Sequence, residues 1–90
     1  MKRYIIERNI PGIEGLNAQQ LQSTAKAGNA AVAELAGKAQ WEQSFVVADK
    51  TFCVFRADSE ASLHQHAQLS GFPITKITEV SAIIDPMSGA

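Results

Sequence analysis

The segment from residue 40 to residue 57 restricts the fold of this chain more than any other part. It reads QWEQSFVVADKTFCVFRA, and two runs rich in aromatic and β-branched residues flank the pair Asp49-Lys50. Such runs around a short polar link are typical of a β-hairpin, here with strands over 40–48 and 51–57. We therefore expect an antiparallel sheet organised around these two strands.

A two-residue loop at Asp49-Lys50 predicts the register of this hairpin. The facing pairs are then Val46 with Cys53, Val47 with Phe52, and Ser44 with Phe55. Because side chains alternate between the two faces of a strand, one face carries Glu42, Ser44, Val46, Thr51, Cys53 and Phe55. The other face carries Trp41, Gln43, Phe45, Val47, Phe52, Val54 and Arg56. Both faces of the hairpin are thus largely apolar.

One strand and one helix are predicted before the hairpin. Residues 3–10, RYIIERNI, are rich in β-branched and aromatic residues and stop at a Pro-Gly pair, which predicts a first strand. The helix begins at Asn17, whose side chain can form a capping box with Gln20, and ends near Gly37. Its apolar stripe has mostly small residues, which suit close packing on a sheet: Ala18, Leu21, Ala25, Gly28, Val32 and Leu35.

A second helix and a fourth strand are predicted after the hairpin. The helix begins at Asp58 or Ser59, which are both good N-caps, and ends before Gly71. The strand covers 76–84, and the last few residues are expected to be loose. The order β-α-β-β-α-β predicts an α+β, ferredoxin-like sandwich, in which a four-stranded antiparallel sheet carries two helices on one face. Right-handed crossovers place the first and third strands in the centre, and the 90 residues form a single domain, 1–90.

Composition and charge limit the partners of such a domain. The net charge is −1 and the basic residues are scattered, so neither nucleic acid nor an anionic membrane is expected as a partner. No apolar run has the length of a membrane span or of a signal-peptide core, and the single cysteine excludes an internal disulfide. We expect a cytoplasmic protein. Two helices can cover one sheet face only, so the exposed Phe and Val residues of the other face predict a homodimer through the sheet.

Cys53 and His66 are the candidate metal ligands. Cys53 lies in a central strand between Phe52 and Val54, where a small buried core residue is the alternative. His64 and His66 form an H-x-H pair, but two steps along a helix rotate by about 200°, so one subunit cannot chelate an ion with both rings. His66 lies on the stripe that faces the sheet and His64 faces water. For His66, the alternative is a half-buried histidine that bonds to a backbone group.

Glu7 and Ser44 are the candidate ligand-binding residues. Glu7 and Glu79 can flank one another on neighbouring strands, as a hard metal or an acid–base pair needs, or each can pair with a nearby basic side chain. Ser44 has no histidine close in sequence and no nucleophile-elbow glycines. No glycine-rich phosphate loop and no CxxC motif occurs. The chain therefore has no complete catalytic signature, and whether it is an enzyme stays open.

The motifs WxxSFVxxDKTFCVF, AxSExxLxxHAxxSGFP, ITEV and a closing IDP follow one another along the chain. With the opening YIIER, they resemble a small bacterial ferredoxin-like family, formerly catalogued as a domain of unknown function, whose members are often described as nickel-binding proteins. The similarity covers nearly the whole chain outside the first helix. It implies a ferredoxin-like fold, a dimer through the sheet and metal binding, with Ser44, Cys53 and His66 at matching positions. Many members carry a histidine where this chain has Gln43, which removes one potential ligand.

Three functional hypotheses follow. The first is a dimeric binding protein for nickel or another divalent transition metal, with imidazole and thiolate donors. The second is a small enzyme or organic-ligand-binding module that resembles the dimeric α+β barrels. In that case Glu7, Ser44, Cys53 and His66 line a partly polar cavity and His66 is the acid–base group. The third is a structural homodimer with no small ligand.

Overall fold

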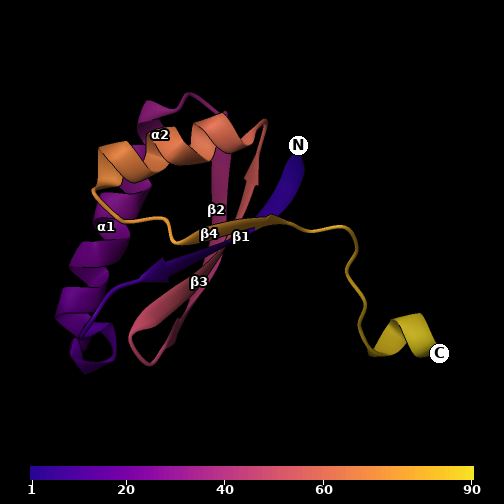
Figure 1. The fold of residues 1–90 in the computed structure, drawn as a ribbon, viewed down its shortest axis with the longest axis horizontal. Coiled ribbons are helices and arrows are strands. Elements are labelled where there is room, and N and C mark those ends of the chain that lie inside the picture. Colours follow the sequence, from indigo (N-terminus) through magenta and orange to yellow (C-terminus); the bar gives the residue numbers. More distant parts are fainter.

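The computed structural model describes residues 1–90. Its main elements follow the predicted order: β1 (Lys2–Asn9), α1 (Ala18–Glu34), β2 (Ala39–Val47), β3 (Lys50–Ala57), α2 (Glu60–Ser70) and β4 (Lys76–Glu79). Two short 3-10 helices are added, η1 (Ile13–Gly15) and η2 (Pro86–Gly89). Figure 1 shows both helices packed over one side of the sheet, which confirms the predicted α+β sandwich.

The sheet has the order β2-β3-β1-β4 with antiparallel neighbours throughout. The predicted central pair, β1 and β3, is confirmed, and its register runs from Lys2 opposite Ala57 to Asn9 opposite Lys50. On the inner face, which the helices cover, this pair contributes most of the core. The buried apolar cluster comprises Tyr4, Ile6, Leu35, Ala39, Cys53, Phe55, Ala57 and Leu63.

The caps of the helices agree with the sequence patterns. Asn17 Oδ1 accepts a hydrogen bond from Gln20 N at 2.8 Å, and Gln20 Oε1 accepts one from Asn17 N at 2.9 Å, which completes the capping box of α1. Gly37 follows α1 at φ 85° and Gly71 follows α2 at φ 79°, both in the left-handed region that glycine adopts without strain. No helix of this protein combines the length and the hydropathy needed to cross a bilayer.

The predicted hairpin register is wrong by two residues. The turn lies at Ala48-Asp49, so that Ser44 faces Cys53. Ala48 adopts φ 49°, and Asp49 is tied to the loop after β1, since its carbonyl accepts from Ile10 N at 2.8 Å and its Oδ1 from Gly12 N at 3.1 Å. This non-local anchor fixes the turn. Because a slip by two residues preserves the alternation, it leaves side chains on their predicted faces.

A β-bulge in β2 changes the faces of two residues. The register shifts between Trp41 and Gln43, which leaves Glu42 without a partner in β3. The extra residue of a bulge moves the strand residues that precede it to the face opposite to the one that simple alternation predicts. Trp41 therefore lies opposite Phe55 on the inner face, with ring centroids 6.5 Å apart, while Glu42 turns to the outer face and pairs with Arg3. The predicted faces of Trp41 and Glu42 are both wrong for this reason.

The fourth strand is shorter than predicted. β4 ends at Glu79, and Val80 N donates a last hydrogen bond to Arg3 O at 2.8 Å. Continued in the same register, Val80 and Ser81 would face Arg3 and Lys2, and the predicted residues 82–84 would extend past the start of β1. Figure 1 shows the chain leaving the body of the domain from this point as an extended arm. The end of the arm is the single turn η2, closed by a capping box between Asp85 and Ser88.

Candidate functional site

A pocket of about 230 Å³ lies between the inner face of the sheet and helix α1. Its wall is mostly apolar with a few polar groups, which is the usual character of small-ligand sites. Three of the four residues singled out from the sequence line it together, namely Ser44, Cys53 and His66. The complete lining comprises Arg8, Ile10, Ile13, Leu21, Thr24, Ala25, Gly28, Trp41, Ser44, Val46, Thr51, Cys53, Phe55, His66 and Phe72.

His66 reaches this pocket from the inner side of α2. Its ring is 1% exposed and packs edge-on against Phe55, with ring centroids 4.9 Å apart. Nε2 lies 3.2 Å from the carbonyl oxygen of Gly28 in α1, whereas Nδ1 is buried without a hydrogen-bond partner. The sequence prediction that His66 faces the sheet is confirmed, and His64 is exposed as predicted.

The surroundings of His66 set its charge and its tautomer. Burial holds the pKa of His66 below its ordinary value of 6.5; the hydrogen bond with the Gly28 carbonyl raises it in part, and the nearby Arg8 guanidinium lowers it further. The ring is therefore neutral at physiological pH. A carbonyl oxygen can only accept, so its contact assigns the proton to Nε2 and leaves a lone pair on Nδ1. Nδ1 can thus accept a proton from a ligand or coordinate a metal.

Ser44 and Cys53 face each other across β2 and β3. Ser44 Oγ accepts a hydrogen bond from Trp41 Nε1 at 2.9 Å, which leaves its own O–H free to donate into the pocket. Cys53 is buried and free, with Sγ 3.4 Å from Thr51 Oγ1. The bulge that brings Trp41 to the inner face therefore also creates the partner of Ser44.

Arg8 is the lining residue that sequence reasoning missed. Arg8 is not among the candidate site residues of the sequence, but it is 2% exposed and lies on the inner face. The signal was available, since Tyr4, Ile6 and Arg8 follow the period of two that places them on one face of β1. All three are buried in the structure.

Glu7 does not join this pocket. It occupies an odd position of β1, so it lies on the outer face, where it pairs with Lys50 Nζ at 3.7 Å. Glu79 faces Tyr4 across β1 and β4 and pairs with Lys2 Nζ at 3.3 Å. The two carboxylates therefore lie on opposite faces of the sheet and cannot flank one another.

The pocket offers few donors to a metal ion. No group of three or more His, Cys, Asp or Glu side chains is arranged to hold one. Among the lining residues, His66 and Cys53 supply the only imidazole and the only thiol. The guanidinium of Arg8 shares this small volume, and its positive charge opposes that of a bare cation. A metal held here therefore needs further ligands from outside the chain.

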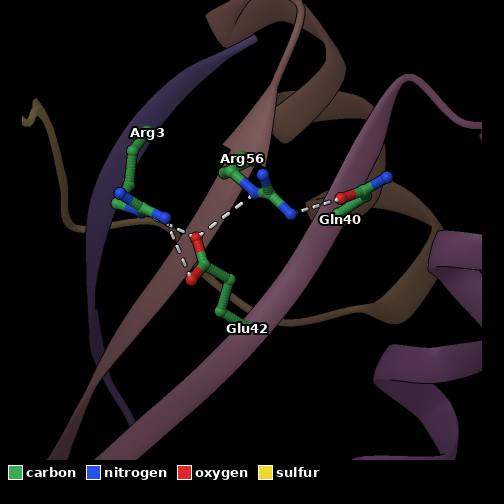
Figure 2. Close-up of polar contacts among 4 residues, drawn as sticks. All are labelled: Arg3, Gln40, Glu42 and Arg56. Carbon is green, nitrogen blue, oxygen red and sulfur yellow. Dashed lines mark hydrogen bonds and ion pairs between the residues drawn. The ribbon is translucent and has the colours of Figure 1, made fainter.

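The outer face of the sheet carries a separate charged cluster at the end near the bulge. Figure 2 shows Glu42 between Arg3 and Arg56. Arg3 Nε donates to Glu42 Oε1 at 2.7 Å and Nη2 to Oε2 at 3.3 Å, while Arg56 Nη2 donates to Gln40 Oε1 at 3.0 Å. The hydrogen bond from Arg3 is the main reason why the pKa of Glu42 is lower than its usual 4.5. These groups are satisfied among themselves and leave no free carboxylate there.

Comparisons with known proteins agree with this architecture. The family model described as "Nickel responsive protein SCO4226-like" matches residues 4–80. The crystal structure of SCO4226 from Streptomyces coelicolor A3(2) is similar to this chain, with a TM-score of 0.74 and 18% sequence identity, and the alignment covers 91% of this chain and 99% of that chain. At that identity the structural similarity establishes the fold alone. No match is found among curated proteins.

Proposed function

The chain belongs to the SCO4226-like family of nickel-responsive proteins, and on this premise we propose that it is a small homodimeric binding protein for nickel or another divalent transition metal. The observation that carries the proposal is the buried, unpartnered Nδ1 of His66, a residue that lines the same pocket as Cys53. Imidazole nitrogen and thiolate suit nickel, copper and zinc. The proposed ligand set is His66 and Cys53, completed by water or by a small ligand.

Calorimetric titration of untagged, metal-free protein with Ni²⁺ tests this proposal. Wild type is expected to bind in the micromolar range, and both His66→Gln and Cys53→Ala are expected to weaken binding by about tenfold or more, which corresponds to about 1.4 kcal/mol. His64→Gln is the matched control, because His64 is exposed on the same helix. If untagged protein binds no divalent metal below the millimolar range, the metal proposal fails. If His64→Gln alone weakens binding, the interaction is an adventitious surface effect.

An organic-ligand-binding module is the second candidate, and the wall of the pocket favours it. Aromatic and aliphatic side chains such as Trp41, Phe55 and Leu21 surround a few polar groups. Such a wall is typical of sites for small organic molecules. Soaking of crystals with small organic acids, followed by difference density in the pocket, provides a direct check. No reaction is assigned to this module.

The outer face of the sheet supports the homodimer part of the proposal. Ile5, Phe45 and Val47 are 39%, 53% and 48% exposed there, and neither helix covers them. Two copies that stack these faces about a twofold axis would remove the same patch from water on both subunits. The proposed location is the cytoplasm, since Cys53 is free and the fold requires no oxidising compartment.

A further inference from the structure

Arg8 places a permanent positive charge inside the domain. A guanidinium does not lose its proton in proteins, yet Arg8 is only 2% exposed and takes part in none of the ion pairs of the structure. Nη1 lies 3.0 Å from the Pro73 carbonyl oxygen and 3.5 Å from that of Phe72, and the Phe72 ring centroid is 5.9 Å away. Nη2 is buried with no partner at all. Buried charges are normally paired, so an opposite charge is missing here.

The pocket that Arg8 lines contains nothing to supply that charge. No aspartate or glutamate is among its lining residues. The polar groups that accompany Arg8 include Ser44, whose O–H is free to donate because its oxygen already accepts from Trp41 Nε1. A site with a buried cation, a free hydroxyl donor and an apolar wall is complementary to an anion with an apolar body.

We propose that the pocket binds a small organic anion, whose carboxylate or phosphonate group pairs with Arg8 and whose apolar part lies against the aromatic wall. Its size follows from the volume. A cavity of about 150 Å³ holds benzene, so the pocket of about 230 Å³ has room for one ring and a short acidic substituent. The lone pair of His66 Nδ1 can then accept a hydrogen bond from a hydroxyl group of the ligand, or coordinate a metal ion that binds together with the ligand.

This inference rests on the proposed binding role of the pocket but not on nickel. An anion beside Arg8 would balance the charge that opposes a bare cation, and it would supply ligands that the chain lacks. The two proposals can nevertheless fail separately. The anion is tested in metal-stripped buffer, and the metal is titrated in the absence of organic acids.

Fluorescence of Trp41 provides the experiment, because it is the single tryptophan and it lines the pocket. Wild-type protein is titrated with phenylacetate, with phenylphosphonate and with the neutral phenylacetamide. A saturable quenching or wavelength shift of the Trp41 emission is expected with at least one of the two anions. The neutral amide is expected to bind more weakly than phenylacetate by about tenfold or more. The comparison of phenylacetate with phenylphosphonate distinguishes a carboxylate ligand from a phosphoryl ligand. This part needs no variant.

Substitution then assigns the effect to Arg8. Arg8→Met preserves much of the apolar length and is expected to weaken anion binding by about tenfold or more, while Arg8→Lys, which keeps the charge and loses the forked donors, is expected to bind at an intermediate level. Arg56→Met, the same substitution on the outer face, is the control and should bind as wild type. The proposal is overturned if the amide binds as well as the acid, if neither anion binds at millimolar concentration, or if folded Arg8→Met binds phenylacetate as wild type does.

Discussion

His66 and Arg8 are two basic side chains that burial affects in opposite ways. Arg8 cannot lose its proton, so it remains a cation among apolar neighbours. His66 can lose its proton, and its lowered pKa keeps the ring neutral with a lone pair on Nδ1. The pocket therefore contains one fixed positive charge and one strong acceptor in a small volume. This difference is the chemical basis of both binding proposals.

The stability of the metal-free protein is expected to fall as the pH is lowered below 6.5, the ordinary pKa of His66. The unfolded chain takes up the proton there while the folded chain, with its lower pKa, does not, so the unfolded state binds more protons and the free energy of unfolding decreases. Besides burial, the two groups that act on the pKa of His66 are the Gly28 carbonyl, which raises it, and Arg8, which lowers it. Urea unfolding at several pH values between about 7.5 and about 5 measures the slope.

Two variants separate this effect from other titrations. His66→Gln is expected to flatten the slope between pH 6.5 and about 5, whereas His64→Gln on the exposed side of the same helix should leave it unchanged. Asp58 and Glu42 have pKa values below their ordinary 3.8 and 4.5, so the stability that they contribute is lost at more acidic pH. If the free energy of unfolding of His66→Gln depends on pH as strongly as that of wild type, this histidine is not the cause of the pH dependence.

Among the elements, α1 crosses β2 closely at Gly28. A β-carbon added there would lie 3.6 Å from Trp41 Cζ3 and 4.0 Å from Phe72 Cε2, which are ordinary van der Waals contacts. The position therefore does not need glycine for space, although the small residues of the helix stripe predicted close packing on the sheet. The carbonyl of Gly28 remains essential to the site, since it accepts from His66 Nε2.

Gly28→Ala is expected to raise the free energy of unfolding by up to about 1 kcal/mol, because alanine favours the helix interior by that amount. Gly71→Ala is the opposite case. Gly71 has φ 79°, a conformation that costs a residue with a β-carbon about 1–2 kcal/mol, so this variant should be less stable than wild type. Urea unfolding of the two variants and wild type gives both changes. A destabilised Gly28→Ala would mean that the helix and the sheet tolerate no added methyl group at this crossing.

For the molecule as a whole, the two faces of the sheet differ in what covers them. The inner face is closed by α1 and α2, whereas the outer face leaves Phe45 and Val47 about half exposed. The arm after β4 adds Ile83 and Ile84, which are 63% and 84% exposed. A second copy of the chain is the proposed cover for the outer face, because a twofold arrangement requires no partner of different chemistry.

Phe45→Glu is expected to prevent the proposed dimer from forming, since it places a charge on the apolar outer face that would be buried between the two subunits. Leu69→Glu is the matched control, because Leu69 is 51% exposed but lies on α2. Multi-angle light scattering after gel filtration measures the mass of both variants. A monomeric wild type, or a dimeric Phe45→Glu protein, would contradict the proposed interface.

The order of elements and the inward position of His66 could be predicted from the sequence, because they depend on local patterns. The sheet topology follows from that order through the rule that crossovers are right-handed. The period of the apolar residues distinguishes strands from helices, and the Asn17–Gln20 capping box and Gly71 mark helix ends. Because a helix rotates by about 100° per residue, His64 and His66 point to nearly opposite sides of α2. The placement of Ser44 and Cys53 on one face could also be predicted, because the alternation within each strand is kept when the register is wrong by two residues.

The tertiary structure alone decided the register, the bulge and the composition of the pocket. The turn of the hairpin is fixed by contacts between Asp49 and the loop after β1, and no local preference of the sequence specifies them. The bulge at Glu42 moves Trp41 into the pocket. The alternation in β1 places Arg8 inward, but only the folded chain reveals that no carboxylate forms an ion pair with it. The absence of a partner depends on every other segment, and a sequence pattern cannot report it.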